Sequence, residues 1–186
     1  SVTRGTKGYY NAQAGTIGKL LLQARRLCEA GAGYVTIHAS YAGVWDMHAD
    51  GNNLNMRNGM DAVGYSFDHA VASFIEDCEA RGLSDKIMLV CCGEMGRTPK
   101  LNKRGGRDHW AKLAPLMIYG GGFDGGRVIG QSDRMGGEPV TDAFNPRHLI
   151  STILRSVIDP GQLRLIPNVP KEVTELLEHP PITGLG

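Results

Sequence analysis

The chain has 186 residues and a mass of 20.1 kDa, and its 20 Lys+Arg against 19 Asp+Glu leave a formal net charge of +1. Such a balance gives the molecule no overall field that would recruit nucleic acid or an anionic membrane. A hydrophobic share of 41% excludes a long disordered chain, and no apolar run reaches the roughly 20 residues that span a bilayer.

The first predicted elements are two helices with a strand between them. Between Asn11 and Ala30 apolar residues recur with helical spacing, and Gly31 supplies a stop. The β-branched run 34–39 (YVTIHA) predicts a strand. A second helix is expected from Ser66, which serves as the N-cap, to about Gly82.

The second half predicts two buried strands followed by helices. Residues 87–91 (IMLVC) and 114–119 (APLMIY) are apolar without alternation, as expected for strands buried on both faces. The sequence further predicts a short edge strand at 128–129 and helices at 146–157 and 170–177. This order indicates an α/β fold, a mainly parallel sheet flanked by helices, in a single domain over residues 1–186.

The four cysteines include no CxxC pair and no matching His spacing, which excludes a disulfide scaffold and a zinc finger. Cys91 and Cys92 continue an apolar run, so we expect both to be reduced and packed. The glycine-rich stretch 120–126 (GGGFDGG) follows a strand but matches no nucleotide-binding pattern, so it is interpreted as a turn.

Two long polar loops, 40–65 and 92–113, follow the first two predicted strands and hold the candidate ligands. The first carries Asp46 and His48, and the second carries Glu94 and the pair Asp108–His109. Carboxylate and imidazole together suit a divalent ion such as zinc, manganese or calcium. Because ligands collect beyond the carboxyl ends of parallel strands, we expect these side chains to converge there. The competing interpretation is a surface His–Asp pair with Trp45 and Trp110 anchoring the loops.

A basic stretch lies within the second loop. From residue 97 to residue 107 there are five basic residues and no acid. Arg97 and Arg107 are the candidates for binding a substrate anion, because a guanidinium matches phosphate or sulfate oxygens two at a time. Backbone N–H groups at Gly105 and Gly106 could approach the same anion. The alternative is a solvated basic loop that balances the nearby acids.

The blocks VWDMHADGNN, GEMGRTPKLNKRGGRDHW and IYGGGFDGGRVIGQSDRMGGEPV resemble the domain of unknown function 1501 family, from about Tyr9 to Pro170. That family is sulfatase-like, and the resemblance extends to the alkaline phosphatase-like superfamily. It implies that Asp46 and His48 bind one metal ion and that His109 is a further ligand, with Asp108 as a ligand or an orienting partner of His109. Glu94 occupies the place of an Asp–His pair, but no His follows it.

The resemblance also implies what the chain lacks. The superfamily takes its nucleophile from a strand and helix in its N-terminal half, and no such arrangement precedes Asn11. The chain begins at Ser1 without Met, so it is expected to be the C-terminal part of a longer protein and to have little activity alone. Thr98 is the one hydroxyl considered as a substitute nucleophile, although holding its loop is the favoured role.

Two functions remain open at this point. One is metal-dependent hydrolysis of sulfate or phosphate esters, in which the metal ion and Arg97 and Arg107 stabilise a small anionic ester. The other is a non-catalytic binding or scaffold domain that retains the fold. The remaining partners expected are the N-terminal half of the same protein or a second copy, and the family resemblance implies a periplasmic or exported location.

Overall fold

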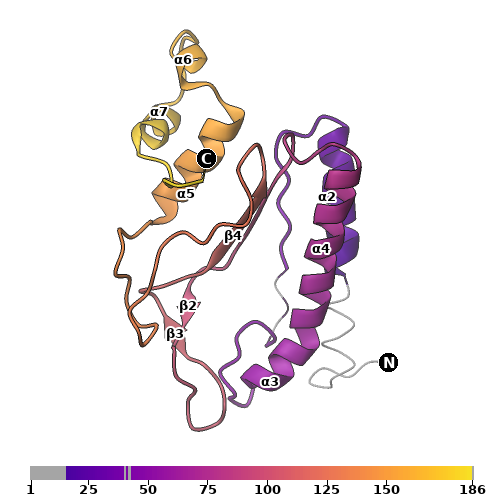
Figure 1. The fold of residues 1–186 in the computed structure, drawn as a ribbon, viewed down its shortest axis with the longest axis vertical. Coiled ribbons are helices and arrows are strands. Elements are labelled where there is room, and N and C mark those ends of the chain that lie inside the picture. The colour runs from indigo at the N-terminus through magenta and orange to yellow at the C-terminus, as the bar shows by residue number, and fades with distance from the viewer. Residues whose placement is uncertain (1–15, 40, 42, 186) are drawn as a thin grey trace.

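The computed structural model describes residues 16–39, 41 and 43–185, and its secondary structure is mainly helical (Figure 1). Two small antiparallel sheets accompany the helices, each with two strands. In chain order the elements are α2 (Ile17–Glu29), α3 (Met56–Gly59), the π-helix η1 (Met60–Gly64), α4 (Tyr65–Ala80), β1 (Met88–Cys92), β2 (Gly96–Arg97), β3 (His109–Trp110), β4 (Leu116–Gly120), α5 (Pro146–Val157), α6 (Pro160–Leu163) and α7 (Lys171–Glu178).

The predicted parallel sheet is wrong. Strand β1 pairs with β4 in antiparallel register, with Met88 opposite Gly120 and Cys92 opposite Leu116. A parallel pair needs a crossover connection, usually through a helix. The connection here, residues 93–115, contains no helix and instead holds the β2–β3 hairpin, so the chain returns in the opposite direction.

The strand predicted over 34–39 is also absent, although the segment is extended. Val35, Ile37 and Ala39 are less exposed than Thr36 and His38, which is the alternation of a strand with one face on the core. Ile37 and Ala39 do pack against that core. The segment therefore has the burial pattern of a strand, but it forms no ladder with β1 or β4.

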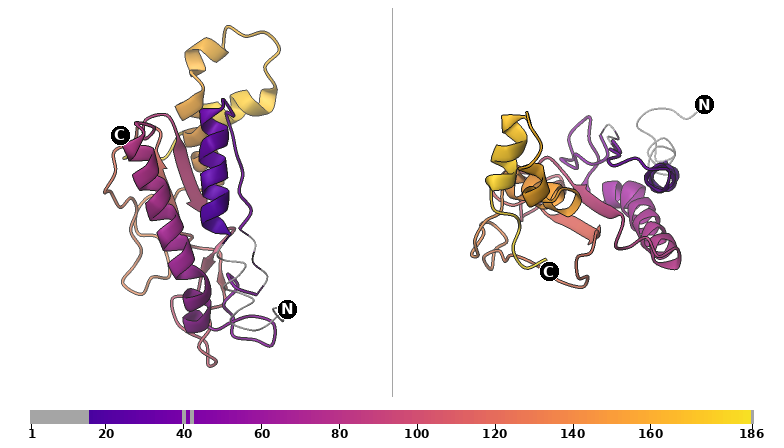
Figure 2. Two further views of the ribbon diagram at one scale, coloured as in Figure 1. Left: turned by 90° about the vertical axis from the view of Figure 1, so that its right-hand side faces the viewer. Right: turned by 90° about the horizontal axis from the view of Figure 1, so that it is seen from above.

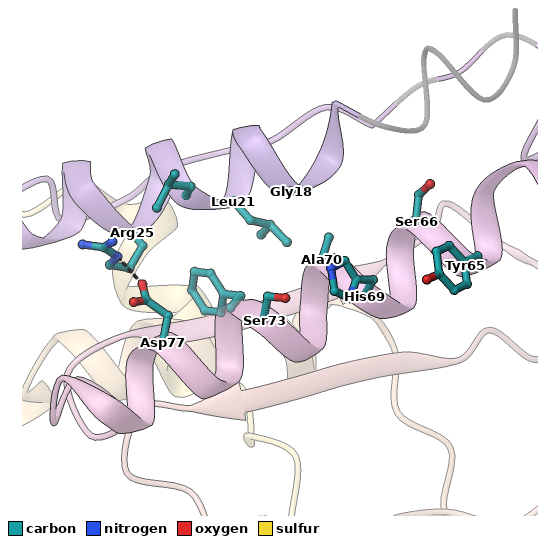
Figure 3. Close-up of a pocket in the computed structure, with 11 residues that line it drawn as sticks. Gly18, Leu21, Arg25, Tyr65, Ser66, His69, Ala70, Ser73 and Asp77 are labelled. Atoms are coloured by element: carbon teal, nitrogen blue, oxygen red, sulfur yellow. Dashed lines mark ion pairs between the residues drawn. The ribbon is translucent and has the colours of Figure 1, made fainter. Parts of the chain in front are cut away.

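Helices α2 and α4 lie side by side, as both views in Figure 2 show. A Cβ on Gly18 would contact the Ala70 side chain at 3.7 Å, so the two helices approach closely there. Further along, the buried guanidinium of Arg25 is ion-paired with Asp77 at 2.7 Å (Figure 3). The first helix is thus confirmed from Ile17 onward, while Asn11 to Gly15 lie outside the described residues.

The N-cap of the second helix lies eleven residues earlier than predicted, at Asn55 instead of Ser66. Helical structure is continuous from Met56 through the π-helix to Ala80, and Asn55 caps it by accepting a hydrogen bond from the backbone N–H of Asn58. Ser66 therefore lies inside the helical segment and is not its N-cap. The signal was present in the sequence, because Asn is among the preferred capping residues.

The two helices cover one face of the β1–β4 sheet. Leu89 and Cys91 of β1, with Met117 and Tyr119 opposite them on β4, pack against a core that includes Leu21 of α2 and Phe74 of α4. The strands are half-buried, so the prediction that β1 is buried on both faces is wrong. Cys91 is packed, and burial raises the pKa of its thiol, but Cys92 is exposed, contrary to expectation.

Helix α5 spans the predicted residues, with Pro146 in its first turn and Asn145 as its cap. It packs against α7, which lies within one residue of its predicted bounds, and Figure 1 shows this pair displaced from the α2–α4 core.

The edge strand predicted at 128–129 is wrong, since Val128 is 96% exposed and belongs to no strand. The turn at 120–126 is confirmed, with positive φ at Gly120 and its two successors. Among the described helices none is long and apolar enough to cross a membrane.

Candidate metal centre

The β2–β3 hairpin places His109 opposite Arg97. The two strands have two residues each, and their register pairs Gly96 with Trp110 and Arg97 with His109. The hairpin needs glycine at position 96, because a Cβ there would lie 1.6 Å from the carbonyl oxygen of Leu113. A two-residue strand has no detectable periodicity, which explains why the sequence did not predict it.

Asp46 and His48 come from the loop that precedes α3. Met47 between them is buried, as is Val44, so the loop is anchored by its apolar residues. The loop is closed by backbone hydrogen bonds from Leu54 to Gly43 and from Ala49 to Leu54. Asp46 and His48 therefore flank the buried Met47 in a loop whose backbone is held in place.

Two hydrogen bonds fasten the second loop onto the first. The backbone N–H of Arg107 donates to the carbonyl oxygen of Met47 at 2.8 Å, and Asn102 Nδ2 donates to that of His48 at 2.9 Å. Asn102 Nδ2 also lies 3.1 Å from Asp108 Oδ1. At Gly106 a Cβ would lie 2.3 Å from the carbonyl carbon and oxygen of His48, so only glycine allows this approach. Asn102 was not predicted as a site residue, because a single amide among basic residues matches no motif.

These contacts bring Asp46, His48 and His109 together. The Nε2 atoms of the two histidines are 3.0 Å apart, Asp46 Oδ1 is 3.0 Å from His109 Nε2, and it is 3.2 Å from His48 Nε2. His48 is mostly buried, whereas Asp46 and His109 are about half exposed. Three ligand atoms therefore form a nearly equilateral triangle open to solvent on one side.

The donor set fits a divalent ion of the zinc type. Ligand atoms about 2.0–2.1 Å from zinc stand roughly 3.3 Å apart when arranged as a tetrahedron. The three separations fall only slightly short of that value. Two imidazole nitrogens and one carboxylate oxygen would leave the fourth position free, which is the arrangement of catalytic rather than structural zinc sites.

Arg97 lies directly beside this triangle. Its Nη2 atom is 2.8 Å from Asp46 Oδ1 and 3.4 Å from Glu94 Oε1. Its Nη1 atom is buried and has no hydrogen-bond partner among the described residues. Glu94 therefore forms an ion pair with Arg97 and is not one of the three converging ligands.

The electrostatics of the centre keep Asp46 ionised. Partial burial alone raises the pKa of this carboxyl. The hydrogen bond with His109 and the nearby charges of Arg97, His48 and His109 outweigh burial, so the pKa is lowered overall. A carboxylate that stays charged well below neutral pH is available as a metal ligand.

Asp108 is placed beside His48 rather than His109. Its Oδ1 atom is 3.5 Å from His48 Nδ1, the ring nitrogen that does not face the other ligands. Carboxylates in this position commonly orient a metal-binding imidazole and fix its tautomer.

Two further candidate residues have structural contacts. Arg107 donates from Nη1 to the carbonyl oxygens of Thr98 and Pro99 at 2.6 and 2.7 Å. The hydroxyl of Thr98 donates to the carbonyl oxygen of Lys100 and accepts from the backbone N–H of Asp108. The loop-holding role predicted for Thr98 is therefore confirmed, while anion binding by Arg107 stays a prediction.

The histidines not assigned to the site lie apart from the triangle. His148 accepts from the backbone N–H of Asn145 and so completes the cap of α5, and His179 packs edge-on against it. His69 stacks on Tyr65 along α4, and His38 is exposed.

A profile for the family described as "Protein of unknown function (DUF1501)" matches residues 2–165. No curated protein and no solved structure matches the chain. Because the profile covers well over half of the sequence, the chain belongs to the DUF1501 family.

Proposed function

We propose that this member of the DUF1501 family binds one divalent metal ion through Asp46, His48 and His109 and uses that site to bind and hydrolyse sulfate or phosphate esters. The observation that carries the proposal is the convergence of the three ligand atoms within 3.0–3.2 Å of one another. Two neutral imidazoles and a carboxylate are a common ligand set for zinc and its neighbours.

Each residue has a defined task in this proposal. His48 and His109 present Nε2 lone pairs, Asp46 supplies the negative charge, and Asp108 holds the His48 ring in place. When bound, the metal ion would act as a Lewis acid toward an ester oxygen. Metal binding requires a free lone pair on each imidazole nitrogen, so protons compete with the metal ion for the same two atoms.

Arg97 is the anion-binding residue of the proposal. Its Nη2 atom is engaged by Asp46, but its buried Nη1 atom has no partner among the described residues. A buried donor without a partner is costly, and an oxygen of a bound sulfate or phosphate would satisfy it. The guanidinium would then neutralise charge on the group being transferred.

The hydrolytic step rests on the family resemblance of the GRTP and GRDHW blocks. A specific observation favours the alternative of a binding domain without hydrolysis. Glu94 is well exposed and paired with Arg97, and among residues 16–39, 41 and 43–185 no second ligand set forms around it. Thr98, the substitute nucleophile considered above, is engaged at its hydroxyl on both the donor and the acceptor side.

Zinc titration by calorimetry, with elemental analysis of the dialysed protein, tests the metal site. We expect one equivalent in the wild-type chain and its loss in His48→Ala and His109→Ala. His69→Ala, which removes an exposed imidazole on α4, is the matched control and should retain the metal ion. Binding that survives His109→Ala would refute the site.

Orthophosphate binding and ester turnover by the zinc-loaded chain separate the two functions. Arg97→Gln should weaken orthophosphate binding in either case. Turnover of p-nitrophenyl sulfate or phosphate that disappears in His109→Ala would support hydrolysis. Zinc-dependent anion binding without turnover would support the binding domain.

A further inference from the structure

The loop next to the metal centre carries two unpaired cations at its tip. Lys103 and Arg104 are both exposed, within a stretch from residue 97 to residue 107 that has no acidic residue. Among residues 16–39, 41 and 43–185, no ion pair involves either side chain. The two arginines at the ends of this stretch do have partners, because Arg97 is paired with Asp46 and Arg107 donates to backbone carbonyl oxygens.

The tip, defined as residues 102–106, is closed on itself by Asn102. The Oδ1 atom of Asn102 accepts from the backbone N–H groups of Arg104 and Gly106, both at 3.0 Å. Its own backbone N–H donates to the carbonyl oxygen of Gly106 at 2.8 Å. A short loop held by three hydrogen bonds at its base has little freedom to fold its cations away.

The tip is also fixed relative to the metal centre. The same Asn102 donates from Nδ2 to the carbonyl oxygen of His48, and Gly106 packs on the backbone of His48. Lys103 directly follows Asn102, so their Cα atoms are about 3.8 Å apart. On the other side, the backbone N–H of Met56 donates to the carbonyl oxygen of Gly105, so the start of α3 also contacts the tip.

We infer that the ester bound at the metal centre carries a second anionic group, which Lys103 and Arg104 bind while Arg97 and the metal ion hold the first. This inference rests on the proposed function, since it names the substrate class of the same site. Lys103 and Arg104 are consecutive and exposed, and neither has an ion-pair partner among the described residues, so a second sulfate or phosphate group would supply the missing counter-charge. The substrate class is therefore an ester with several sulfate or phosphate groups, such as a sulfated oligosaccharide.

Calorimetry on the zinc-loaded chain with two probes tests the inference. The probes are a short dextran sulfate, which carries several sulfate groups, and orthophosphate, which carries one anionic centre. Lys103→Gln/Arg104→Gln removes the tip charges, and Lys19→Gln/Lys86→Gln removes two exposed charges on α2 and before β1 as the control. We expect the tip variant to bind dextran sulfate about 5- to 10-fold more weakly at moderate salt, with its orthophosphate affinity unchanged.

The outcomes separate this inference from the function on which it rests. An equal loss in both double variants would show a general charge effect and overturn the inference, and so would a tip variant that binds dextran sulfate as the wild type does. A single-stranded oligonucleotide that binds more tightly than dextran sulfate would also overturn it. In each of these cases the proposed function still stands, provided that the wild-type chain binds zinc and His109→Ala does not. A wild-type chain that binds no zinc refutes both.

Discussion

His48 and His109 face each other through Nε2 atoms 3.0 Å apart, although only one of two neutral imidazoles can donate a proton across such a contact. Asp46 Oδ1 lies within reach of both rings. Three electron-rich atoms that point at one place are stabilised by a cation between them. The side chains are thus arranged as ligands more than as a hydrogen-bonded network.

Asp108→Asn tests whether the carboxylate beside His48 supports the site. Because Asp108 lies 3.5 Å from Nδ1 of a ring that presents Nε2 to the metal, we expect zinc affinity to fall about 10- to 100-fold without loss of the one-to-one stoichiometry. Competition with a chelator of known affinity measures it. Asp85→Asn, which changes an exposed carboxylate before β1, should leave the affinity unchanged.

Arg97→Gln should raise the pKa of Asp46 toward its ordinary value in the metal-free chain. In the wild type, burial raises this pKa, but the His109 hydrogen bond and the Arg97 and His48 charges lower it overall. A lowered pKa contributes stability above the unfolded-state pKa of about 4, and that contribution is lost as the pH falls through the folded-state pKa. Carbon-detected NMR of the Asp46 carboxyl during an acid titration measures the shift. Identical titration curves in both proteins would contradict the electrostatic account.

At the scale of elements, the centre depends on one loop packing against the backbone of another. Gly106→Ala should displace residues 102–107, because the new Cβ would lie 2.3 Å from the carbonyl group of His48. We expect zinc affinity to fall at least about tenfold, since a displacement of about 1 Å disrupts preorganised ligands. Gly125→Ala is the matched control, as its Cβ would meet no atom within 4 Å. Equal affinities in the two variants would show that the loop contact does not position the ligands.

The sequence predicted the elements that have a strong local pattern. Helix α2 has a clear apolar stripe, β1 and β4 are apolar runs, and α5 begins with a capping Asn and Pro146. The direction of β4 was not predictable in this way, because strand pairing depends on the path of the connecting chain. The π-helix and the two-residue strands β2 and β3 are too short or irregular to leave a periodic signal.

The sequence predicted the three converging residues, but the reason given for their convergence was wrong. Asp46, His48 and His109 do lie together, but the ends of parallel strands do not bring them there. The β2–β3 hairpin positions His109, and hydrogen bonds from Asn102 and Arg107 hold it against the first loop. The first loop is shorter than the predicted 40–65, because residues 56–65 are helical, and the second contains the β2–β3 hairpin. The contacts between them are long-range and have no signature in either loop alone.

At the scale of the whole molecule, one core links the helices to the larger sheet. Phe74 of α4 is 7% exposed and meets Tyr119 of β4 edge-on, with ring centroids 6.5 Å apart. Phe74→Ala should therefore lower the free energy of unfolding by about 3–5 kcal/mol. Urea denaturation measures it, with Val128→Ala as the exposed control expected to change little. A loss below about 1 kcal/mol would indicate that this core does not carry the stability of the fold.

The measurement that tests the central claim most directly is an anomalous difference map, recorded at the zinc absorption edge from crystals grown with zinc. We expect one strong peak about 2.0–2.2 Å from an Asp46 carboxylate oxygen and from the Nε2 atoms of His48 and His109. A map without a peak there, or with zinc bound instead to the exposed Cys92 or to His148 and His179, would contradict it.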